Sequence, residues 1–394
     1  MTVSPSYSVR SLPEKLLVAY TVNDCQDLDK LSKVTEAVVK GVNVLIWSFG
    51  HFQTTHKKGS DADQPLSLEF STSQNSQNLR TYQEQLRSMG YDDVVHLASI
   101  GGWNAPHLPP GFSGKDLLDA FQSVNLQFCH NEIDGEEGKG KQRCHLWDGI
   151  DWDLEGNDNL QSPRNEFTKD CLDEMGSMSA LAKQQGLIVS MAPPESYLDI
   201  TTPRFSRFVN LTYADDPWHL DFSYHGANVY AYVLAKWGDT IDFVFLQFYE
   251  SYTHASFQVS QNGVKPGIYL EQYVHQLVGG NDKQNAGYLV DFGEDPILDL
   301  GTQFVELPLS KLVLGFANGW AKNDDDKVLF FPIKEVKKAY ESMKKAQTIP
   351  RGMGFWNIEE EGTSGVTLSS GLNSILGIRK ATLNLDKNKM GETH

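Results

Sequence analysis

The segment LLVAYTVNDCQDLDKLSKVTEAVVKGVNVLIWSF, residues 16–49, has the pattern of a strand, a helix and a second strand. Both of its ends are short runs of apolar and β-branched residues, which are typical of buried strands. Between them Leu31, Val34 and Val38 recur at helical spacing, and Gly41 marks the end of the helix. The segment therefore predicts a β-α-β unit at the start of the fold.

The same alternation of apolar runs and amphipathic stretches continues along the rest of the chain. Six further strands are predicted at 94–102, 149–156, 186–195, 242–250, 311–320 and 353–360. Further helices are predicted at about 76–89, 115–128, 164–185, 226–237, 269–278, 332–346 and 369–379. The longest stretches without either pattern are 53–75, 196–225 and 251–268. Strands without polar alternation are typical of a sheet that is covered on both faces.

Eight strands, each followed by a helix, predict a single-domain α/β fold, the (β/α)8 TIM barrel. A doubly wound open sheet is the alternative, but it would carry a glycine-rich phosphate loop after an early strand. The glycine-containing stretch 99–102 lacks that spacing. We expect the barrel to span 15–380, with an N-terminal extension at 1–14 and a C-terminal tail at 381–394.

The charge composition of the chain limits the classes of molecule that it is expected to bind. The 394 residues include 34 Lys and Arg against 51 Asp and Glu, a formal net charge of −17, which argues against nucleic acid and anionic membranes as partners. No apolar run approaches the roughly 20 residues of a membrane span. We expect a secreted, extracellular monomer, although no signal peptide is visible at the N-terminus and an intracellular location stays open. Residues 210–212, Asn-Leu-Thr, form an N-glycosylation pattern.

The four cysteines contain no CxxC pair, which argues against a zinc site. Cys129 and Cys144 bracket a polar loop that a disulfide could close. The alternative is that all four are ordinary buried or free thiols.

Three carboxylates follow one another at every second position of the strand at 149–156. Asp151, Asp153 and Glu155 share one face, which we expect to point into the barrel, because Trp152 and its apolar neighbours suit the side toward the helices. Carboxylates in file oppose one another's ionisation, so at least one should keep a proton near neutral pH, as a general acid requires. Asp148 lies three positions before Asp151 and therefore falls on the other face of the strand, so it is expected to play a supporting structural role. A magnesium or calcium site is the alternative, but it would want further acids on neighbouring strands; we expect no metal and no cofactor.

The stretch DGIDWDLE, 148–155, resembles the DxxDxDxE signature of glycoside hydrolase family 18, the chitinase family. Other predicted strand ends are similar to that family as well. SIGGW at 99–103 resembles its SxGG motif, Met191-Ala192-Pro193 its fifth-strand motif and Gln247-Phe248-Tyr249 its sixth-strand motif. Trp356 lies where the family keeps a tryptophan on the eighth strand. The resemblance runs from about residue 16 to 360.

The resemblance implies a role for each matching residue. Glu155 would protonate the leaving oxygen, Asp153 would hold the substrate's acetamide and Asp151 would share a proton or hydrogen bond with Asp153. Tyr249 would donate a hydrogen bond to the acetamide oxygen, which acts as the nucleophile. The expected substrate-binding residues are Gln247, Trp356, Met191, Ser99, Gly102, Trp103, Tyr20 and Phe49. Glu250 departs from the family, which usually has Asn or Asp after the sixth-strand Tyr.

The substrate implied is chitin or oligosaccharides of N-acetylglucosamine. Many members carry an α+β insertion between strands seven and eight, but residues 321–351 read mostly as one helix, which resembles the branch with an open groove and endo-acting cleavage. Trp103, Trp320 and Tyr224 are candidate stacking platforms at the rim. An endo-β-N-acetylglucosaminidase acting on N-glycans and a lectin-like chitin-binding protein are the alternatives; the lectins typically lose the catalytic Glu, which is present here as Glu155.

Overall fold

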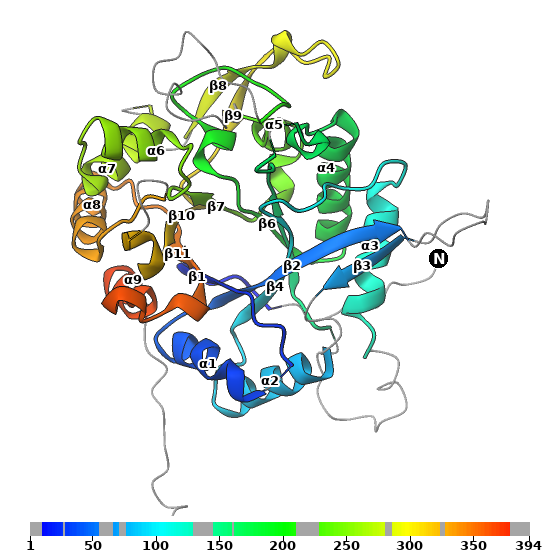
Figure 1. The fold of residues 1–394 in the computed structure, drawn as a ribbon, viewed down its shortest axis with the longest axis vertical. Coiled ribbons are helices and arrows are strands. Elements are labelled where there is room, and N and C mark those ends of the chain that lie inside the picture. Colours follow the sequence, from blue (N-terminus) through cyan, green and yellow to red (C-terminus); the bar gives the residue numbers. More distant parts are fainter. Residues whose placement is uncertain are drawn as a thin grey trace, which may run out of the picture.

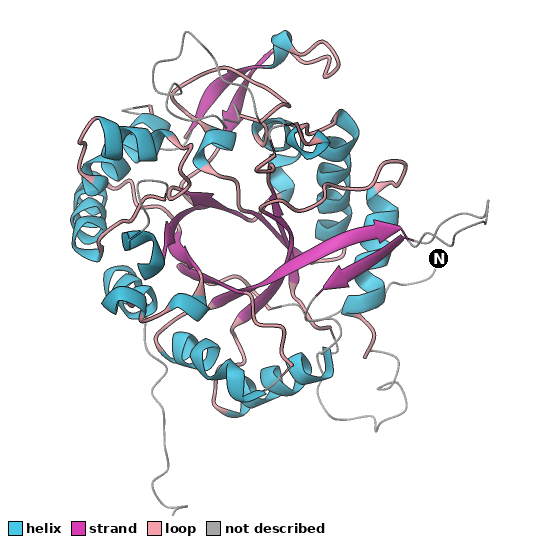
Figure 2. Cartoon of the chain, in the orientation of Figure 1, coloured by secondary structure: helices cyan, strands magenta, loops and turns pink. Residues whose placement is uncertain are grey.

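A computed structural model describes residues 10–26, 28–54, 66–70, 76–128, 145–159, 161–209, 228–279, 286–323 and 328–378. Eight parallel strands close into a ring in the order β1-β2-β4-β5-β6-β7-β10-β11, with β11 pairing again with β1. Figures 1 and 2 show this ring at the centre, with the helices arranged around it. The predicted single-domain (β/α)8 barrel is confirmed. The barrel strands are β1 Leu16–Thr21, β2 Val44–Thr54, β4 Val95–Gly102, β5 Gly149–Leu154, β6 Ile188–Met191, β7 Phe243–Gln247, β10 Leu312–Ala317 and β11 Gly352–Trp356.

The helices lie close to the predicted ranges, and local caps explain where several begin. Ser113 forms a capping box with Asp116 ahead of α3, and the Thr168 hydroxyl accepts from the backbone N–H of Cys171 to start α4. That cap places the start of α4 five residues later than expected, after a short 3-10 turn at Pro163–Asn165. The α-helices are α1 Ser32–Val39, α2 Ser76–Ser88, α3 Gly114–Asn125, α4 Lys169–Gln184, α5 Ala231–Trp237, α6 His254–Ser256, α7 Pro266–Leu277, α8 Ile333–Ala346 and α9 Leu368–Leu376.

Alternate residues of the barrel strands pack into two separate apolar cores. On β1, Val18 and Tyr20 face the barrel interior, whereas Leu17 and Ala19 face the surrounding helices. On β5 the side facing the helices carries Ile150, Trp152 and Leu154, all at most 1% exposed, as the sequence predicts. The side chains on the opposite side of β5 therefore face the barrel interior.

Two hairpins lie outside the predicted elements. β2 continues past the ring to Thr54 and pairs antiparallel with β3, Leu66–Phe70, inside a stretch expected to be irregular. β8, Gly287–Asp291, and β9, Thr302–Glu306, form a second hairpin between α7 and β10, outside the ring at the top of Figure 1. The described residues between β10 and β11 hold a 3-10 turn and helix α8.

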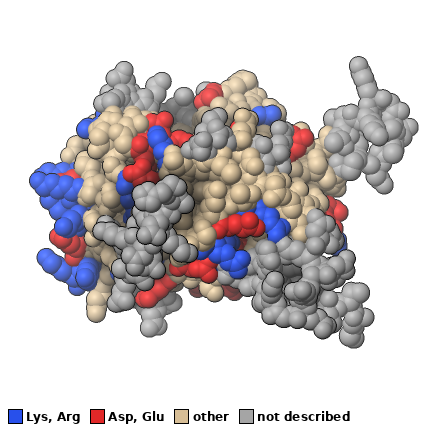
Figure 3. Space-filling view, turned by 90° about the horizontal axis from the view of Figure 1, so that it is seen from below, with Lys and Arg blue, Asp and Glu red and all other residues tan. Residues whose placement is uncertain are grey.

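Several further expectations concern the surface and the thiols. Cys129, Cys144, Tyr224 and the Asn-Leu-Thr pattern at 210–212 lie outside the described residues; Cys25 and Cys171 are buried free thiols. Figure 3 shows acidic and basic side chains interspersed on the face it presents, with basic ones gathered at the edge where α8 lies. Within the described ranges, no helix combines the length and the apolar character that crossing a bilayer demands.

Candidate active site

The three carboxylates of β5 lie at its carboxyl end, in the barrel interior. Asp151 is 0%, Asp153 3% and Glu155 5% exposed. In a barrel this end is where active sites form, because the loops that follow each strand surround it. The structure therefore brings the predicted acidic residues together in a buried position.

Asp151 lies deepest and is held by three hydroxyl groups, two from the neighbouring strands β4 and β6 and one from β1. Its Oδ2 accepts from Tyr20 Oη at 3.0 Å and Ser99 Oγ at 2.8 Å, and its Oδ1 accepts from Ser190 Oγ at 2.6 Å. Burial raises the pKa of Asp151 to about 6, although the three hydrogen bonds oppose that rise. The group is therefore protonated over much of the mildly acidic range.

Asp153 and Glu155 form a pair nearer the mouth of the barrel. Burial raises the pKa of both carboxyls well above the ordinary value, and the negative charge of neighbouring carboxylates, including Glu250, raises it further. Because ionisation of one of these two carboxyls disfavours ionisation of the other, the pair tends to retain a proton. Gln247 Nε2 donates to Asp153 Oδ1 at 2.9 Å and to the carbonyl of Ala192 at 2.6 Å, which fixes the orientation of Asp153.

Aromatic side chains from other strands surround the carboxylates. Phe49, at the register irregularity between Trp47 and Gly50 of β2, stacks on Trp356 at the end of β11, with ring centroids 5.4 Å apart. The ring centroids of Tyr20 and Trp356 lie 5.6 Å apart, and Tyr249 is buried in the same interior cluster. The partly exposed Trp356 ring therefore offers an apolar floor next to the acids, on which a sugar ring could stack.

Glycines let β4 approach this site closely. Gly101 has a φ of +121°, and a Cβ there would lie 2.4 Å from the carbonyl oxygen of Asp153. Gly102 has a φ of +95°, and a Cβ there would lie 2.8 Å from the ring of Phe49. Both positions thus require glycine for conformation and for space. Trp103 follows at the rim and is 36% exposed.

Two of the predicted substrate contacts need revision. Met191 packs in the core between sheet and helices, because Ser190 next to it faces Asp151 and neighbouring side chains of a strand alternate. The expected substrate contact of Met191 is therefore wrong, and the inward residues of this segment are Ser190 and Ala192. Ser99 is fully buried and donates to Asp151, so it acts on that carboxylate rather than on a ligand.

Three residues of the site were missed or left open by the sequence. Ser190 could have been found from its parity on β6, whereas Tyr252 lies beyond the end of β7, where strand periodicity no longer applies. Tyr252 Oη donates to Glu155 Oε2 at 3.4 Å. Glu250 lies close enough to Asp153 and Glu155 for its charge to raise their pKa values, and burial raises its own pKa to about 7.

Asp148 lies at the other end of β5 and has a different environment. Its carboxylate pairs with the Arg10 guanidinium at 2.8 Å and accepts from His145 Nε2 at 3.1 Å and the backbone N–H of His96 at 2.9 Å. These donors outweigh burial and hold the pKa of Asp148 below its usual range. The contacts tie the chain ahead of β1 and the segment ahead of β5 to the barrel.

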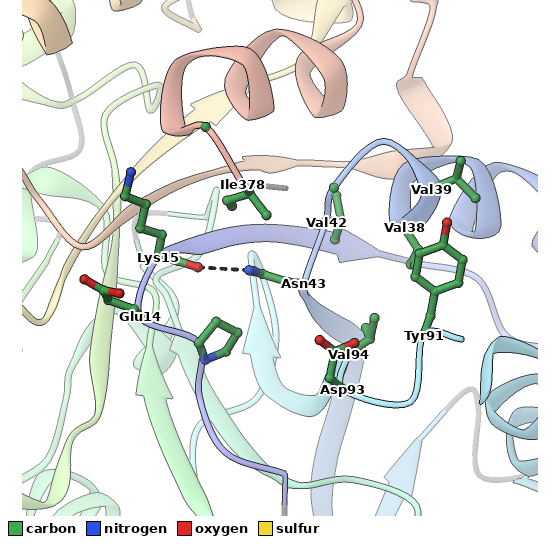
Figure 4. A pocket seen from close by; sticks show the side chains of 13 residues that line it. Glu14, Lys15, Val38, Val39, Val42, Asn43, Tyr91, Asp93, Val94 and Ile378 are labelled. Atoms are coloured by element: carbon green, nitrogen blue, oxygen red, sulfur yellow. Dashed lines mark hydrogen bonds between the residues drawn. The ribbon is translucent and has the colours of Figure 1, made fainter. Parts of the chain in front are cut away.

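A hollow of about 440 Å³ lies at the amino-terminal end of the strands, away from the carboxylates. Figure 4 shows Lys15, which precedes β1, and Asn43, which precedes β2, at this hollow. Asn43 Nδ2 donates to the Lys15 carbonyl at 2.9 Å and its Oδ1 accepts from the N–H of Leu17 at 2.8 Å. Side chains at this end of a barrel serve stability. In the described part of the chain, no cluster of three or more His, Cys, Asp or Glu is arranged to hold a metal ion.

Comparison with known proteins agrees with this architecture. No family model and no curated protein matches the sequence. The chain is similar to the catalytic domain of a hyperthermophilic chitinase from Pyrococcus furiosus, at 12% identity over 96% of this chain and 100% of that one, with a TM-score of 0.51. It is also similar to catalytic-site mutants of active domain 2 of chitinase from Pyrococcus furiosus, at 11% identity over 96% and 100% of the two chains, with a TM-score of 0.50. A fungal endo-β-N-acetylglucosaminidase from glycosyl hydrolase family 18 is similar at 14% identity over 93% and 97%, with a TM-score of 0.47. The first two similarities show a shared barrel fold.

Proposed function

We propose that this chain is a chitinase of glycoside hydrolase family 18, which cleaves β-1,4-linked N-acetylglucosamine with retention of configuration. The observation that carries the proposal is the buried file Asp151, Asp153 and Glu155 at the carboxyl end of β5, with raised pKa values and an aromatic floor beside it. Carboxyl groups that keep a proton near neutral pH suit the protonation of a glycosidic oxygen.

Glu155 is the proton donor in the proposed reaction. Its proton passes to the glycosidic oxygen as the bond from that oxygen to the anomeric carbon breaks. The acetamide oxygen of the same sugar forms a new bond to the anomeric carbon, which gives a cyclic oxazolinium ion. Glu155, now ionised, takes a proton from the water that opens this ring, and the β configuration is restored.

Asp153 and Tyr249 would act on the acetamide. The carboxylate of Asp153 accepts the amide N–H and stabilises the positive charge of the oxazolinium ion, while Tyr249 donates to the acetamide oxygen. Gln247 supports this geometry, because its bond to Asp153 at 2.9 Å fixes one carboxylate oxygen. Asp151 would take up or return the proton that Asp153 gives up or regains, since its pKa of about 6 lies within the working range.

We also propose that the groove is open and the cleavage endo-acting, as in the family branch that lacks the α+β insertion. The presence of helix α8 as the main described element between β10 and β11 supports this. Trp103, 36% exposed, and the partly buried Trp320 are available as stacking platforms along such a groove.

Glu155→Gln is the test of the proposal. The variant should lose hydrolysis of a fluorogenic chitotrioside by at least about 10²–10⁴-fold while it still binds the oligosaccharide, because the amide keeps the shape but cannot donate a proton efficiently. Glu250→Gln is the matched control: it removes a neighbouring carboxylate, so hydrolysis should persist with a shifted pH optimum. Near-normal turnover by Glu155→Gln would contradict the assignment. Cleavage of a high-mannose glycopeptide but not of chitotrioside would show the N-glycan enzyme, and binding without cleavage by the unmodified protein would show a lectin.

A further inference from the structure

The loop after β7 carries a tyrosine that connects the rim of the barrel to Glu155. Tyr252 is 4% exposed, and its hydroxyl donates to Glu155 Oε2 at 3.4 Å. Its ring stacks on that of Trp103, with centroids 5.7 Å apart and an angle of 25° between the planes. The ring contact and the hydroxyl contact together define the position of this side chain between two elements, the end of β4 and the end of β5.

The same loop is anchored from behind by a buried carboxyl group. Glu195, two residues after Pro193 at the end of the β6 segment, is fully buried. Its Oε2 accepts from the backbone N–H of Ala255 at 2.8 Å, and its Oε1 accepts from the hydroxyl of Tyr269 on α7. Ala255 lies three residues after Tyr252. The turn between them is closed by Thr253, whose hydroxyl accepts from the N–H of Ser256 at 3.1 Å.

We propose that Tyr252 is a positioning residue that holds and tunes Glu155, and that Glu195 is the anchor that keeps Tyr252 in place. The proposal rests on the proposed function of Glu155 as the acid. It assigns a role to two residues outside the carboxylate file, and it explains why a carboxyl group is buried behind the loop after β7, where it contacts the loop backbone and α7.

The direction of the effect follows from the donor. A hydroxyl that donates to a carboxylate stabilises the ionised form and lowers its pKa. Tyr252 therefore opposes the forces that raise the pKa of Glu155, which are burial and the charges of Asp153 and Glu250. Without the hydroxyl, Glu155 should hold its proton to higher pH. Other polar and titratable groups near Glu155 are Gln247, Tyr230 and Tyr249, and His107, whose Nε2 lies 2.8 Å from the Glu155 carbonyl oxygen.

Tyr252→Phe tests the first half of the proposal, because it keeps the ring on Trp103 and removes only the hydroxyl. The alkaline limb of the pH profile of kcat/KM, which reports ionisation of the acid, should move up by about half a unit to one unit, as expected for loss of a long hydrogen bond to a charged group. kcat at the optimum should fall roughly fivefold with KM little changed, since the acid is less well oriented. An unmoved limb would overturn the proposal.

Glu195 variants test the second half. Glu195→Ala should move the alkaline limb in the same direction as Tyr252→Phe, and the double variant should move it no further, because both act through one hydrogen bond. Glu195→Gln keeps an acceptor for the Ala255 N–H and should restore the limb of the unmodified protein; burial raises the pKa of Glu195 to about 8, so the neutral amide resembles its state at pH 7. Additive shifts in the double variant would show that Glu195 acts independently. Tyr269→Phe replaces Glu195→Ala should the latter not fold, with a smaller shift in the same direction expected and none on top of Tyr252→Phe.

A second readout separates failure of this inference from failure of the proposed function. The carboxyl carbon of Glu155 can be titrated by NMR without substrate, with Glu155→Gln providing the assignment. A higher Glu155 pKa in Tyr252→Phe supports the proposal even in a protein that hydrolyses no chitin, whereas an unchanged pKa overturns it. Absence of hydrolysis by the unmodified protein contradicts only the proposed function.

Discussion

Replacing Ser190 by alanine removes one of the three hydroxyl groups that donate to Asp151. The Ser190 bond is the shortest of the three, 2.6 Å, and it is made to Oδ1 of Asp151, whereas Tyr20 and Ser99 both donate to Oδ2. Both Ser190 and Asp151 are fully buried, so water does not replace the lost donor. The variant therefore tests whether the hydroxyl groups are what allows Asp151 to ionise inside the barrel.

The magnitude follows from the two charge states of Asp151. A hydrogen bond to a charged group contributes about 1.5–3 kcal/mol and one between neutral groups about 1 kcal/mol. At 1.36 kcal/mol per pKa unit, the difference of about 0.5–2 kcal/mol raises the pKa of Asp151 by about one unit, from about 6 to about 7. The folded pKa already lies above the unfolded value of about 3.8, so ionisation of Asp151 lowers stability as the pH rises from about 4 through 6. In the variant this loss continues to higher pH.

The expected result is a pH-dependent loss of stability. Ser190→Ala should lower the free energy of unfolding by about 1 kcal/mol at pH 4, where Asp151 is neutral in the folded state of both proteins, and by about 2–3 kcal/mol at pH 8. Urea unfolding followed by tryptophan fluorescence at several pH values measures the difference. Other buried carboxyls titrate in both proteins, so their contributions cancel in the comparison.

Ser179→Ala is the matched control for this experiment. Ser179 is also fully buried, donates to the Met175 carbonyl at 2.6 Å and accepts from Trp152 Nε1 at 2.9 Å, but it touches no carboxylate. Its loss should be the same at pH 4 and pH 8. Equal pH dependence in Ser190→Ala and Ser179→Ala would refute the reasoning, because the Ser190 bond would then contribute as much to neutral as to ionised Asp151.

Three further outcomes are expected. Gly101→Ala should lower the free energy of unfolding by about 2 kcal/mol or more and remove most hydrolysis, because the added Cβ would meet the Asp153 carbonyl. Gly111→Ala is the control: Gly111 also has a positive φ but has open space around it, so the loss should be only about 1 kcal/mol. Urea unfolding midpoints measure the stability of both variants, and turnover measures their activity. Arg10→Ala should lower stability by about 3 kcal/mol at pH 7, and the difference should shrink as the pH falls below about 4, because the depressed pKa of Asp148 contributes its full stability above the unfolded value and progressively less toward the folded value. Fully deacetylated chitosan oligomers should bind without being cut, as seen by calorimetry and product analysis; cleavage as fast as that of chitin oligomers would mean a protein nucleophile.

The ring of strands could be predicted because its strands are covered on both faces and read as unbroken apolar runs. The two hairpins could not be predicted in the same way. β9, with Thr302, Phe304 and Glu306 exposed and Val305 buried, lies at the surface and carries only a weak alternation. β3 is a short partner of β2 whose pairing depends on the length of β2 beyond the ring. Both hairpins depend on tertiary pairing rather than on local pattern.

The candidate site was likewise predictable only where its residues lie on strands with a regular alternation. Period-two alternation on β5 correctly placed Asp151, Asp153 and Glu155 together, since a side chain two positions along a strand faces the same way. The same rule applied to β6 would have selected Ser190 in place of Met191, for which the prediction relied on motif resemblance alone. Tyr252 follows a strand end, so no period relates it to Glu155, and only the folded loop brings the two together.

Asp148 and Asp151 show what decides the charge of a buried carboxyl in this barrel. They lie three residues apart and are both fully buried, yet the pKa of Asp148 is lowered and that of Asp151 is raised to about 6. Burial acts in the same direction on both, so the difference comes from their partners. Asp148 faces the Arg10 guanidinium and His145, whereas Asp151 receives three neutral hydroxyls. A cation beside a carboxyl would ionise it near neutral pH and prevent it from donating or relaying a proton. Neutral donors fix the position of a carboxyl without the charge that would remove its proton, so Asp151 and Asp153, which receive hydroxyl and amide donors, keep raised pKa values.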